Sequence, residues 1–287
     1  MQEISHEITL FAEPLFHFKN FVITNALLTS WLVVAIIIFF SFVLRSQLRI
    51  IPGKLQNIFE IIVDGALNLC DQVTNSRILS LKIFPIAISV FFFVLVNNWL
   101  GLLPIGGLGI LERGEHGLAF LPFLRGGTAD VNTTLALAVI AVFGANFFGI
   151  FSIGLWKIFN KYVNVKVLGQ IFTKIKNDKT VIIVAPITFF VGLLELVGEF
   201  AKVASLSFRL FGNVFAGEVL LASMAALFAY LLPVPFLFLE ILVGVIQALI
   251  FSMLLVVYFT ISAADHEEHE HQDDHEIINK ESIINSN

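Results

Sequence analysis

Long apolar runs separated by short polar segments dominate the chain. Three runs extend from about residue 26 to 44, from about 82 to 103 and from about 132 to 159. Two longer runs follow, from about 180 to 230 and from about 236 to 264. Each is long enough to cross a hydrocarbon core of about 30 Å as a helix. The pattern therefore predicts an all-α polytopic membrane protein with about five membrane segments.

A different pattern follows the first run. Between Leu55 and Val73, apolar residues recur at helical spacing, and polar residues occupy the opposite side of the helix. Pro52 and Gly53 separate this stretch from the first span. The stretch is too polar to span a bilayer, so we predict an amphipathic helix at the cytoplasmic interface.

The last two runs are longer than an upright span requires. About fifty helical residues would extend roughly 75 Å, against a hydrocarbon core of about 30 Å. The run from 180 to 230 must therefore be tilted, bent or split. Pro233 and Pro235 mark the turn into the final run. We expect the last two helices to be long, steeply tilted and paired as a helical hairpin.

Basic residues indicate how the chain is oriented. Arg45, Arg49 and Lys54 follow the first span, and six lysines lie between residues 157 and 179. Because positive charge favours the cytoplasmic side, we expect the N-terminus outside and the C-terminus inside.

The same pattern divides the chain into parts. We predict an outer segment over 1–25, one membrane domain over 26–264, and a disordered, acidic and His-rich cytoplasmic tail over 265–287.

Composition excludes several other classes. Hydrophobic residues make up 57% of the chain, charged residues 14%, and the mean hydropathy is +0.91, which a soluble domain of this size could not bury. The lone Cys70 can form no internal disulfide. No nucleotide-binding loop, catalytic Ser/His/Asp set or Cys-based metal site is visible. We therefore expect no cofactor, no metal, no nucleic-acid partner and no ATP hydrolysis by this chain alone.

The tail leaves one alternative open. Its histidines are spaced closely enough for several to reach one transition metal, although a solvated acidic tail has the same composition. The four residues concerned are His266, His269, His271 and His275.

Ionisable residues interrupt the run from Phe189 to Leu221. They are Glu195, Glu199, Lys202, Arg209 and Glu218. A charge at the centre of a spanning helix costs about 2.5 to 3.5 kcal/mol on insertion scales. These groups must therefore face protein or water, pair with one another, or serve a moving charge.

Helical spacing arranges the polar groups around Arg209. Ser205 lies one turn before it and Asn213 one turn after it, whereas Glu218 falls near the opposite side of the helix. In the final run, Glu240 and Gln247 are seven residues apart and share a face.

These residues have structural explanations as well. In these explanations the arginine pairs with a buried acid, the two carboxylates cap helices or pair with neighbours, and the amides join helices by hydrogen bonds. At the level of the whole chain, a secondary ion transporter and a membrane assembly scaffold remain alternatives.

One motif resembles a known family. The sequence SLSFRLFGN from Ser205 to Asn213, followed by Ala216-Gly217-Glu218 and by Gln247, is similar to the signature of subunit a of F-type ATP synthases. Weaker similarity extends to residues 52–56, 97–104 and 128–134, so the resemblance covers about 45 to 262. Many members have proline where this chain has Val203, so a local bend is expected to differ.

The resemblance implies a proton-translocating stator subunit. In that family two long tilted helices lie against a rotating ring of subunit c, and an aqueous half-channel reaches the ring from each side of the membrane. Arg209 matches the arginine that faces the ring's ion-binding carboxylate. The family's proton-path positions match Glu195, Ser205, Asn213, Glu218, Glu240 and Gln247.

Partners and location follow from the same resemblance. The expected partners are the c-ring, the peripheral stalk of subunit b, the rest of the ATP synthase complex, the lipid bilayer and protons. The expected location is a bacterial inner membrane, with an organelle inner membrane as the alternative.

The chemistry of arginine supports that role independently. Arginine keeps its proton at any pH that the membrane meets, so it is a fixed positive charge. Beside a protonated carboxyl group it favours release of the proton. Between two water-filled clefts it repels hydronium and blocks a direct leak. We expect lysine to be a poor substitute, because a desolvated lysine can lose its proton.

Overall fold

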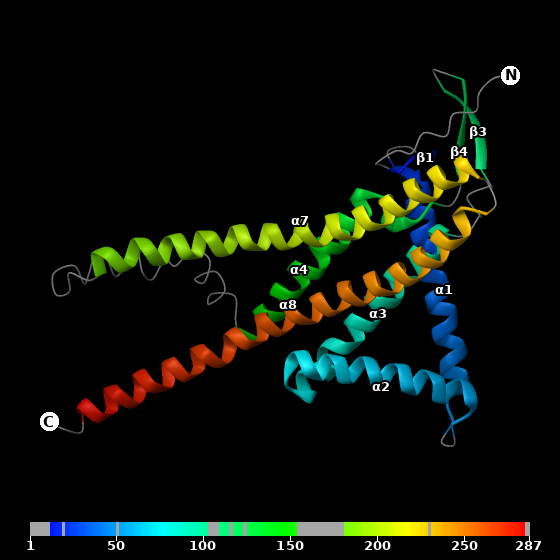
Figure 1. Cartoon of the computed structure of the whole chain (residues 1–287). Helices are drawn as coiled ribbons and strands as arrows, with labels where there is room; N and C mark the ends of the chain where they lie inside the picture. Colours follow the sequence, from blue (N-terminus) through cyan, green and yellow to red (C-terminus); the bar gives the residue numbers. More distant parts are fainter. Residues whose placement is uncertain are drawn as a thin grey trace. The chain divides into compact units, whose positions relative to one another are not determined.

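A computed structural model describes residues 12–18, 21–49, 52–102, 109–114, 117–122, 125–153, 181–228 and 231–284. Most of these residues are helical (Figure 1). The helices are α1 (Asn25–Gln47), α2 (Lys54–Thr74), α3 (Arg77–Leu102), α4 (Val131–Ile153), α7 (Val181–Leu227) and α8 (Pro233–Ile284). The prediction of an all-α polytopic protein is confirmed.

Five helical stretches in these ranges are long and apolar enough to cross a membrane. They are Asn25–Ser46, Arg77–Leu102, Val131–Ile150, Phe190–Leu227 and Pro233–Ala263. The five expected segments are thus present. The amphipathic stretch forms the separate helix α2, as predicted. The loop with the six lysines lies outside the described residues.

Two β-hairpins were not predicted. Strands β1 (Pro14–Phe18) and β2 (Phe21–Thr24) pair antiparallel before α1, and β3 (Gly109–Gly114) pairs antiparallel with β4 (Gly117–Pro122). The first hairpin is rich in aromatic and β-branched residues, which favour strands.

Local signals explain where the first helices begin and end. The Thr24 hydroxyl accepts a hydrogen bond from the Leu27 N–H at 3.3 Å and caps α1. Pro52 and Gly53 interrupt the chain before α2, which ends at Asn75 in a left-handed conformation with φ 51°. Helix α2 thus connects the ends of α1 and α3 (Figure 1).

The described contacts group the chain into two compact units. One unit contains residues 1–138 and 205–256, and the other contains 139–204 and 257–287. We had expected one domain over 26–264. The division falls inside α4, α7 and α8, which are each continuous helices, and not at a linker.

In the first unit, a short 3-10 helix, η2 (Gly127–Ala129), is inserted between α1 and α3. A Cβ atom at Gly127 would lie 2.6 Å from the Asn97 Oδ1 and 2.6 Å from the Ser30 Oγ. A Cβ at Gly126 would lie 3.3 Å from the Cα of Gly101. The glycines therefore let this backbone approach closely, and they fix the chain just before α4.

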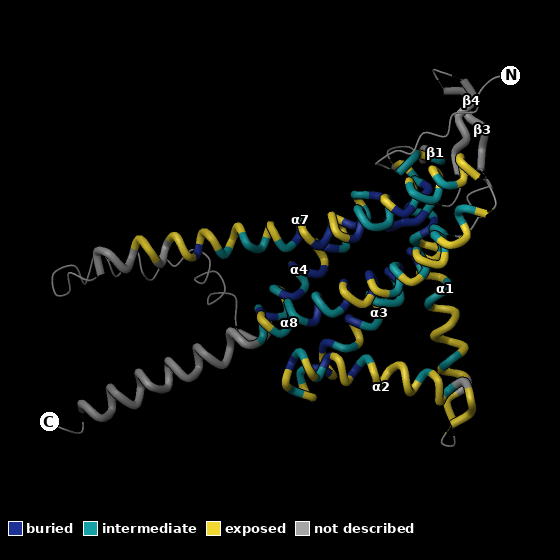
Figure 2. The backbone as a smooth tube through the Cα atoms, in the orientation of Figure 1, coloured by how far each residue is buried: buried dark blue, intermediate teal, exposed yellow. Residues whose placement is uncertain are grey.

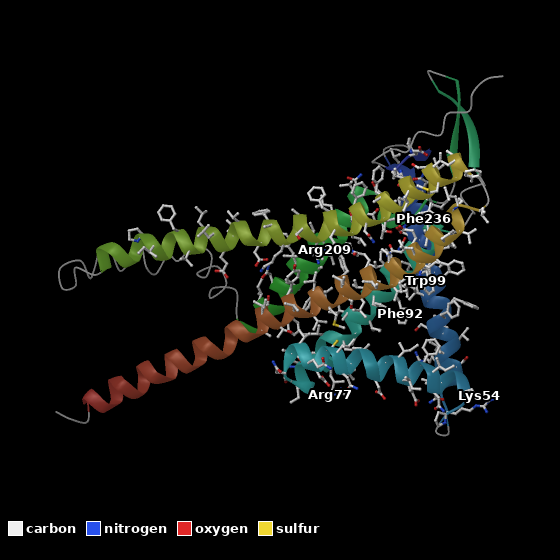
Figure 3. All side chains as sticks on the ribbon, in the orientation of Figure 1. Lys54, Arg77, Phe92, Trp99, Arg209 and Phe236 are labelled. Atoms are coloured by element: carbon white, nitrogen blue, oxygen red, sulfur yellow. The ribbon has the colours of Figure 1, made fainter. Side chains whose placement is uncertain are left out.

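Helix α3 also binds α8 through side chains that reach the α8 backbone. The Asn98 Nδ2 donates to the Gly244 carbonyl at 3.3 Å, and the Trp99 Nε1 donates to the Ile241 carbonyl at 3.3 Å. Figure 3 labels Trp99 on α3. These bonds fix the rotation of α8 about its own axis.

In the second unit, α4, α7 and α8 are joined by a small polar cluster. The Glu199 carboxylate accepts from the Lys202 Nζ at 2.7 Å and from the Asn146 Nδ2 at 3.1 Å. The Lys202 Nζ also lies 5.6 Å from the centre of the Tyr258 ring. The cluster pairs two of the five ionisable groups of the α7 run within the protein.

Large apolar side chains cover the outside of the spans. On α1, Trp31, Phe39 and Phe42 are more than half exposed, and Figure 2 shows exposed residues along much of that helix. Exposed aromatic side chains in such numbers fit a lipid environment and not water.

Helix α8 continues to Ile284, into the segment 265–287 that we predicted as the cytoplasmic tail. The segment contains neither proline nor glycine, so nothing in its backbone chemistry ends a helix that is already formed.

The corner between α2 and α3 contains an ion pair. The Asp71 Oδ2 accepts from the Arg77 Nη1. The Ser80 hydroxyl, followed by the Arg77 guanidinium, stabilises the carboxylate and lowers the pKa of Asp71 below its ordinary value. Both partners belong to α3, so the carboxylate joins the two helices.

We expect Asp71→Asn to destabilise this corner in a pH-dependent way. Because the folded pKa is lowered, the carboxylate stabilises the fold fully above its unfolded pKa, and this stabilisation is lost as pH falls through the folded pKa. Thermal unfolding of the detergent-purified chain should show a lower Tm for the variant at pH 7, and the difference should shrink toward pH 3.

The matched control is Asp64→Asn, which removes an exposed carboxylate from the same helix. Equal Tm losses in the two variants, or a difference from wild type that does not change with pH, would contradict the assignment.

Candidate functional site

Arg209 lies on an exposed side of α7, far from either end of the helix (Figure 3). Its Nη2 lies 3.5 Å from the Ser205 Oγ, one turn earlier. Phe208 beside it is 64% exposed. Within the described residues Arg209 forms no ion pair, which argues against a purely structural salt bridge.

The opposite side of α7 explains this orientation. Leu206 and Leu210 are almost fully buried, and the Ser207 hydroxyl lies 3.3 Å from the Thr134 hydroxyl on α4. Because these residues pack inward, residues 205 and 209 must face outward on a helix. Packing of α7 against α4 therefore presents the guanidinium at the surface.

Small residues continue the exposed face that carries Arg209. Gly212 and Ala216 follow it at helical spacing, and a Cβ at Gly212 would meet no atom within 4 Å. Together with Ser205, they leave the guanidinium between side chains too short to cover it. We call Ser205, Arg209, Gly212 and Ala216 the arginine face. Asn213, also predicted for the site, is half-buried beside it.

Two carboxylates lie further along α7 and α8. Glu218 Oε2 is 3.3 Å from the Nη2 of Arg125, in the segment before η2. Glu240 on α8 lies against the α7 backbone, so that a Cβ at Gly217 would be 2.4 Å from its carboxyl carbon. The structure thus brings Glu240 next to the residue that precedes Glu218.

Gln247 is buried two turns beyond Glu240 on α8. Its Nε2 has no hydrogen-bond partner within the described part of the chain. Buried amide groups normally have partners, so this donor is suited to a water molecule or a partner group.

Glu195 is the one predicted position that belongs to the second unit. It is half-buried, and its neighbour Glu199 is engaged by Lys202 and Asn146. The other predicted positions, Ser205, Asn213, Glu218, Glu240 and Gln247, belong to the same unit as Arg209.

Comparison with known proteins identifies the relatives of this chain. A family model described as ATP synthase A chain matches residues 27–260. The chain belongs to the ATP synthase A chain family. It is therefore a multi-pass membrane subunit of the proton-translocating F-type ATP synthase.

Curated relatives agree over most of their length. ATP synthase subunit a of Geotalea daltonii is 31% identical over 234 residues, which cover 82% of this chain and 85% of the relative. The Mycobacterium ulcerans subunit a is 32% identical over 251 residues, covering 86% and 89%. The chloroplastic subunit a of Stigeoclonium helveticum is 32% identical over 243 residues, covering 84% and 85%.

Arg125 was missed by the sequence analysis. It was not among the residues predicted for the site, yet in the structure it forms an ion pair with Glu218. A signal was available, because Arg125 lies just before the third span and Glu218 lies near the far end of the fourth. Both positions fall at the same predicted side of the membrane.

We expect Gly217→Ala to impair proton movement through the ATP synthase complex that contains this chain. The added methyl group would occupy the position of the Glu240 carboxyl group, which must then move. Passive proton conduction of vesicles stripped of the soluble ATPase sector should fall about tenfold or more, as misplaced reactive groups typically cause.

Gly198→Ala is the matched control. Gly198 lies on the same helix, and a Cβ atom there would meet no atom within 4 Å. A shorter acid should compensate, so Gly217→Ala with Glu240→Asp should conduct better than Gly217→Ala alone. If Gly217→Ala conducts as wild type does, Glu240 is not held where conduction needs it.

Proposed function

We propose that this chain is the stator of the membrane motor, which conducts protons to and from a rotating c-ring. Arg209 faces the ion-binding carboxylate of the ring, and one aqueous half-channel reaches that point from each side of the membrane. Membership of the ATP synthase A chain family supports the proposal.

The arginine face is the observation that carries it. A permanent positive charge within a span costs about 2.5 to 3.5 kcal/mol in lipid on insertion scales, so lipid is a poor neighbour for Arg209. The short side chains of Ser205, Gly212 and Ala216 allow another helix to approach the guanidinium closely. A helix that carries a carboxylate would replace lipid beside the charge and could pack closely against these short side chains. The ring subunit is such a partner.

The chemistry follows from a cation that cannot lose its proton. When a protonated ring carboxyl reaches Arg209, the guanidinium favours the ionised form, and the proton leaves toward the exit half-channel. The same charge repels a proton that would otherwise pass directly between the half-channels. Proton flow is thereby coupled to rotation of the ring.

The outer half-channel is formed around the ends of α7 and α8. Glu218, Glu240 and Gln247 are its polar groups, with the Glu240 carboxyl beside the α7 backbone and the Gln247 amide available to water. The inner half-channel uses Glu195, while Ser205 and Asn213 lie beside Arg209 where the two paths meet the ring.

Orientation and partners complete the proposal. The N-terminus lies outside and the C-terminus in the cytoplasm, because Arg45, Arg49 and Lys54 cluster at the inner end of α1. Subunit b of the peripheral stalk holds the chain against the turning ring. The membrane is a bacterial inner membrane, with an organelle inner membrane as the alternative, because bacterial and chloroplastic relatives match the chain at similar identity.

We expect Arg209→Ala and Arg209→Lys to abolish ATP-driven acidification of inverted vesicles that contain the assembled complex. Alanine removes the fixed charge, so passive leak should rise. Lysine should fail because it can release its proton when desolvated. Acidification and leak are followed together by a fluorescent pH dye, with complex assembly checked by native electrophoresis.

Arg49→Ala is the control, since it removes an exposed arginine at the cytoplasmic end of α1. It should pump normally. Normal pumping by Arg209→Ala in an assembled complex would overturn the proposed mechanism.

A further inference from the structure

The ion pair between Arg125 and Glu218 joins two parts of the chain that are 93 residues apart. The Arg125 side chain is 9% exposed and the Glu218 side chain 24% exposed. Solvent screens such a pair far less than an ion pair on an open surface. The contact is therefore strong enough to affect how Glu218 is placed and charged.

The backbone on the arginine side of this pair is rigidly held. Arg125 directly precedes Gly126 and Gly127, whose backbone is inserted between α1 and α3 with no room for a side chain. The Thr128 hydroxyl then donates to Asn98 Oδ1 at 2.8 Å, and Thr128 is almost fully buried. The backbone at Arg125 is thus held in place, and this fixes how far the guanidinium extends toward α7.

We propose that Arg125 is the positioning residue for proton uptake at Glu218. It holds the carboxylate in one orientation and in its ionised form, so that Glu218 is ready to take a proton from the outer solution. This inference rests on the proposed function, in which Glu218 belongs to the outer half-channel.

The charges around Glu218 give the direction of the effect. Arg125 lies on one side, in the segment before η2, and Glu240 on α8 has its carboxyl against the adjacent Gly217. A neighbouring cation favours an ionised carboxylate, and a neighbouring carboxylate disfavours it. Arg125 therefore favours the ionised form of Glu218, against the opposing effect of Glu240.

The pair also favours release of the proton once it has been taken up. Protonation of Glu218 leaves the Arg125 cation beside a neutral group, so the guanidinium favours onward transfer of the proton, with Arg125 unchanged throughout. Glu240, whose carboxyl group lies against the adjacent Gly217, is the acceptor that we propose. Arg125 acts through Glu218 and does not itself exchange protons.

The experiment measures proton flow out of inverted vesicles that carry the membrane sector. The vesicle lumen corresponds to the outer side, and its pH is set in steps from 6 to 9 while a potassium diffusion potential drives the flow. In Arg125→Gln, the pH of the half-maximal rate should move upward by about one unit or more. Arg125→Lys keeps the charge and should return the profile most of the way to wild type.

Two further variants separate this inference from the proposed function. Glu218→Gln should lose the pH step, and adding Arg125→Gln to it should change the profile no further. Arg49→Gln, which removes an exposed arginine, should leave the profile unchanged.

Each outcome has a defined meaning. If Glu218→Gln conducts with a wild-type profile, the proposed role of Glu218 fails. If Glu218→Gln alters the profile but Arg125→Gln does not, only the positioning role of Arg125 fails. If Arg125→Gln and Arg125→Lys both fail to assemble, Arg125 is a structural residue and the inference is overturned.

Discussion

One permanent charge in an apolar span determines how the rest of this molecule must be built. Arg209 has no acid partner among the described residues and faces outward on α7. Such a group is tolerated only if another molecule or water covers it, since lipid cannot. The buried contacts of α7, including the bond between Ser207 and Thr134, keep the guanidinium on the surface. The internal packing of the chain therefore serves a contact that the chain cannot make by itself.

Close backbone approach sets the positions of the polar groups. Gly127 brings η2 between α1 and α3, and Gly217 makes room for the Glu240 carboxyl. A Cβ atom at Gly244 would lie 3.3 Å from the Cβ of Asn98. A membrane protein gains little from the hydrophobic effect between helices, so close packing and hydrogen bonds carry the specificity. In this chain, glycines allow the close approach, and neighbouring amide, indole and hydroxyl groups supply the bonds.

The sequence predicted those features that depend on one segment at a time. The five spans and the amphipathic α2 follow from hydropathy and helical period. Arg209 was singled out because it is a charged residue within an apolar run. The hairpins before α1 and after α3 were missed because short strands carry a weak signal beside long apolar runs. Arg125 was missed because its importance depends on Glu218, which is distant in sequence, and only the fold brings them together.

The bonds from α3 to α8 end on the carbonyl oxygens of Ile241 and Gly244 and not on side chains. These backbone acceptors do not depend on the outward-facing side chains of α8, so those side chains can change without loss of the two attachments. Glu240 directly precedes one of these anchored positions. Turning α8 by a single residue, about 100°, would break both bonds and carry the carboxylate away from Gly217. The hydrogen bonds from α3 therefore fix the rotation of α8 about its axis. The residues on the exposed face of α8 can vary to suit the partner that this face contacts.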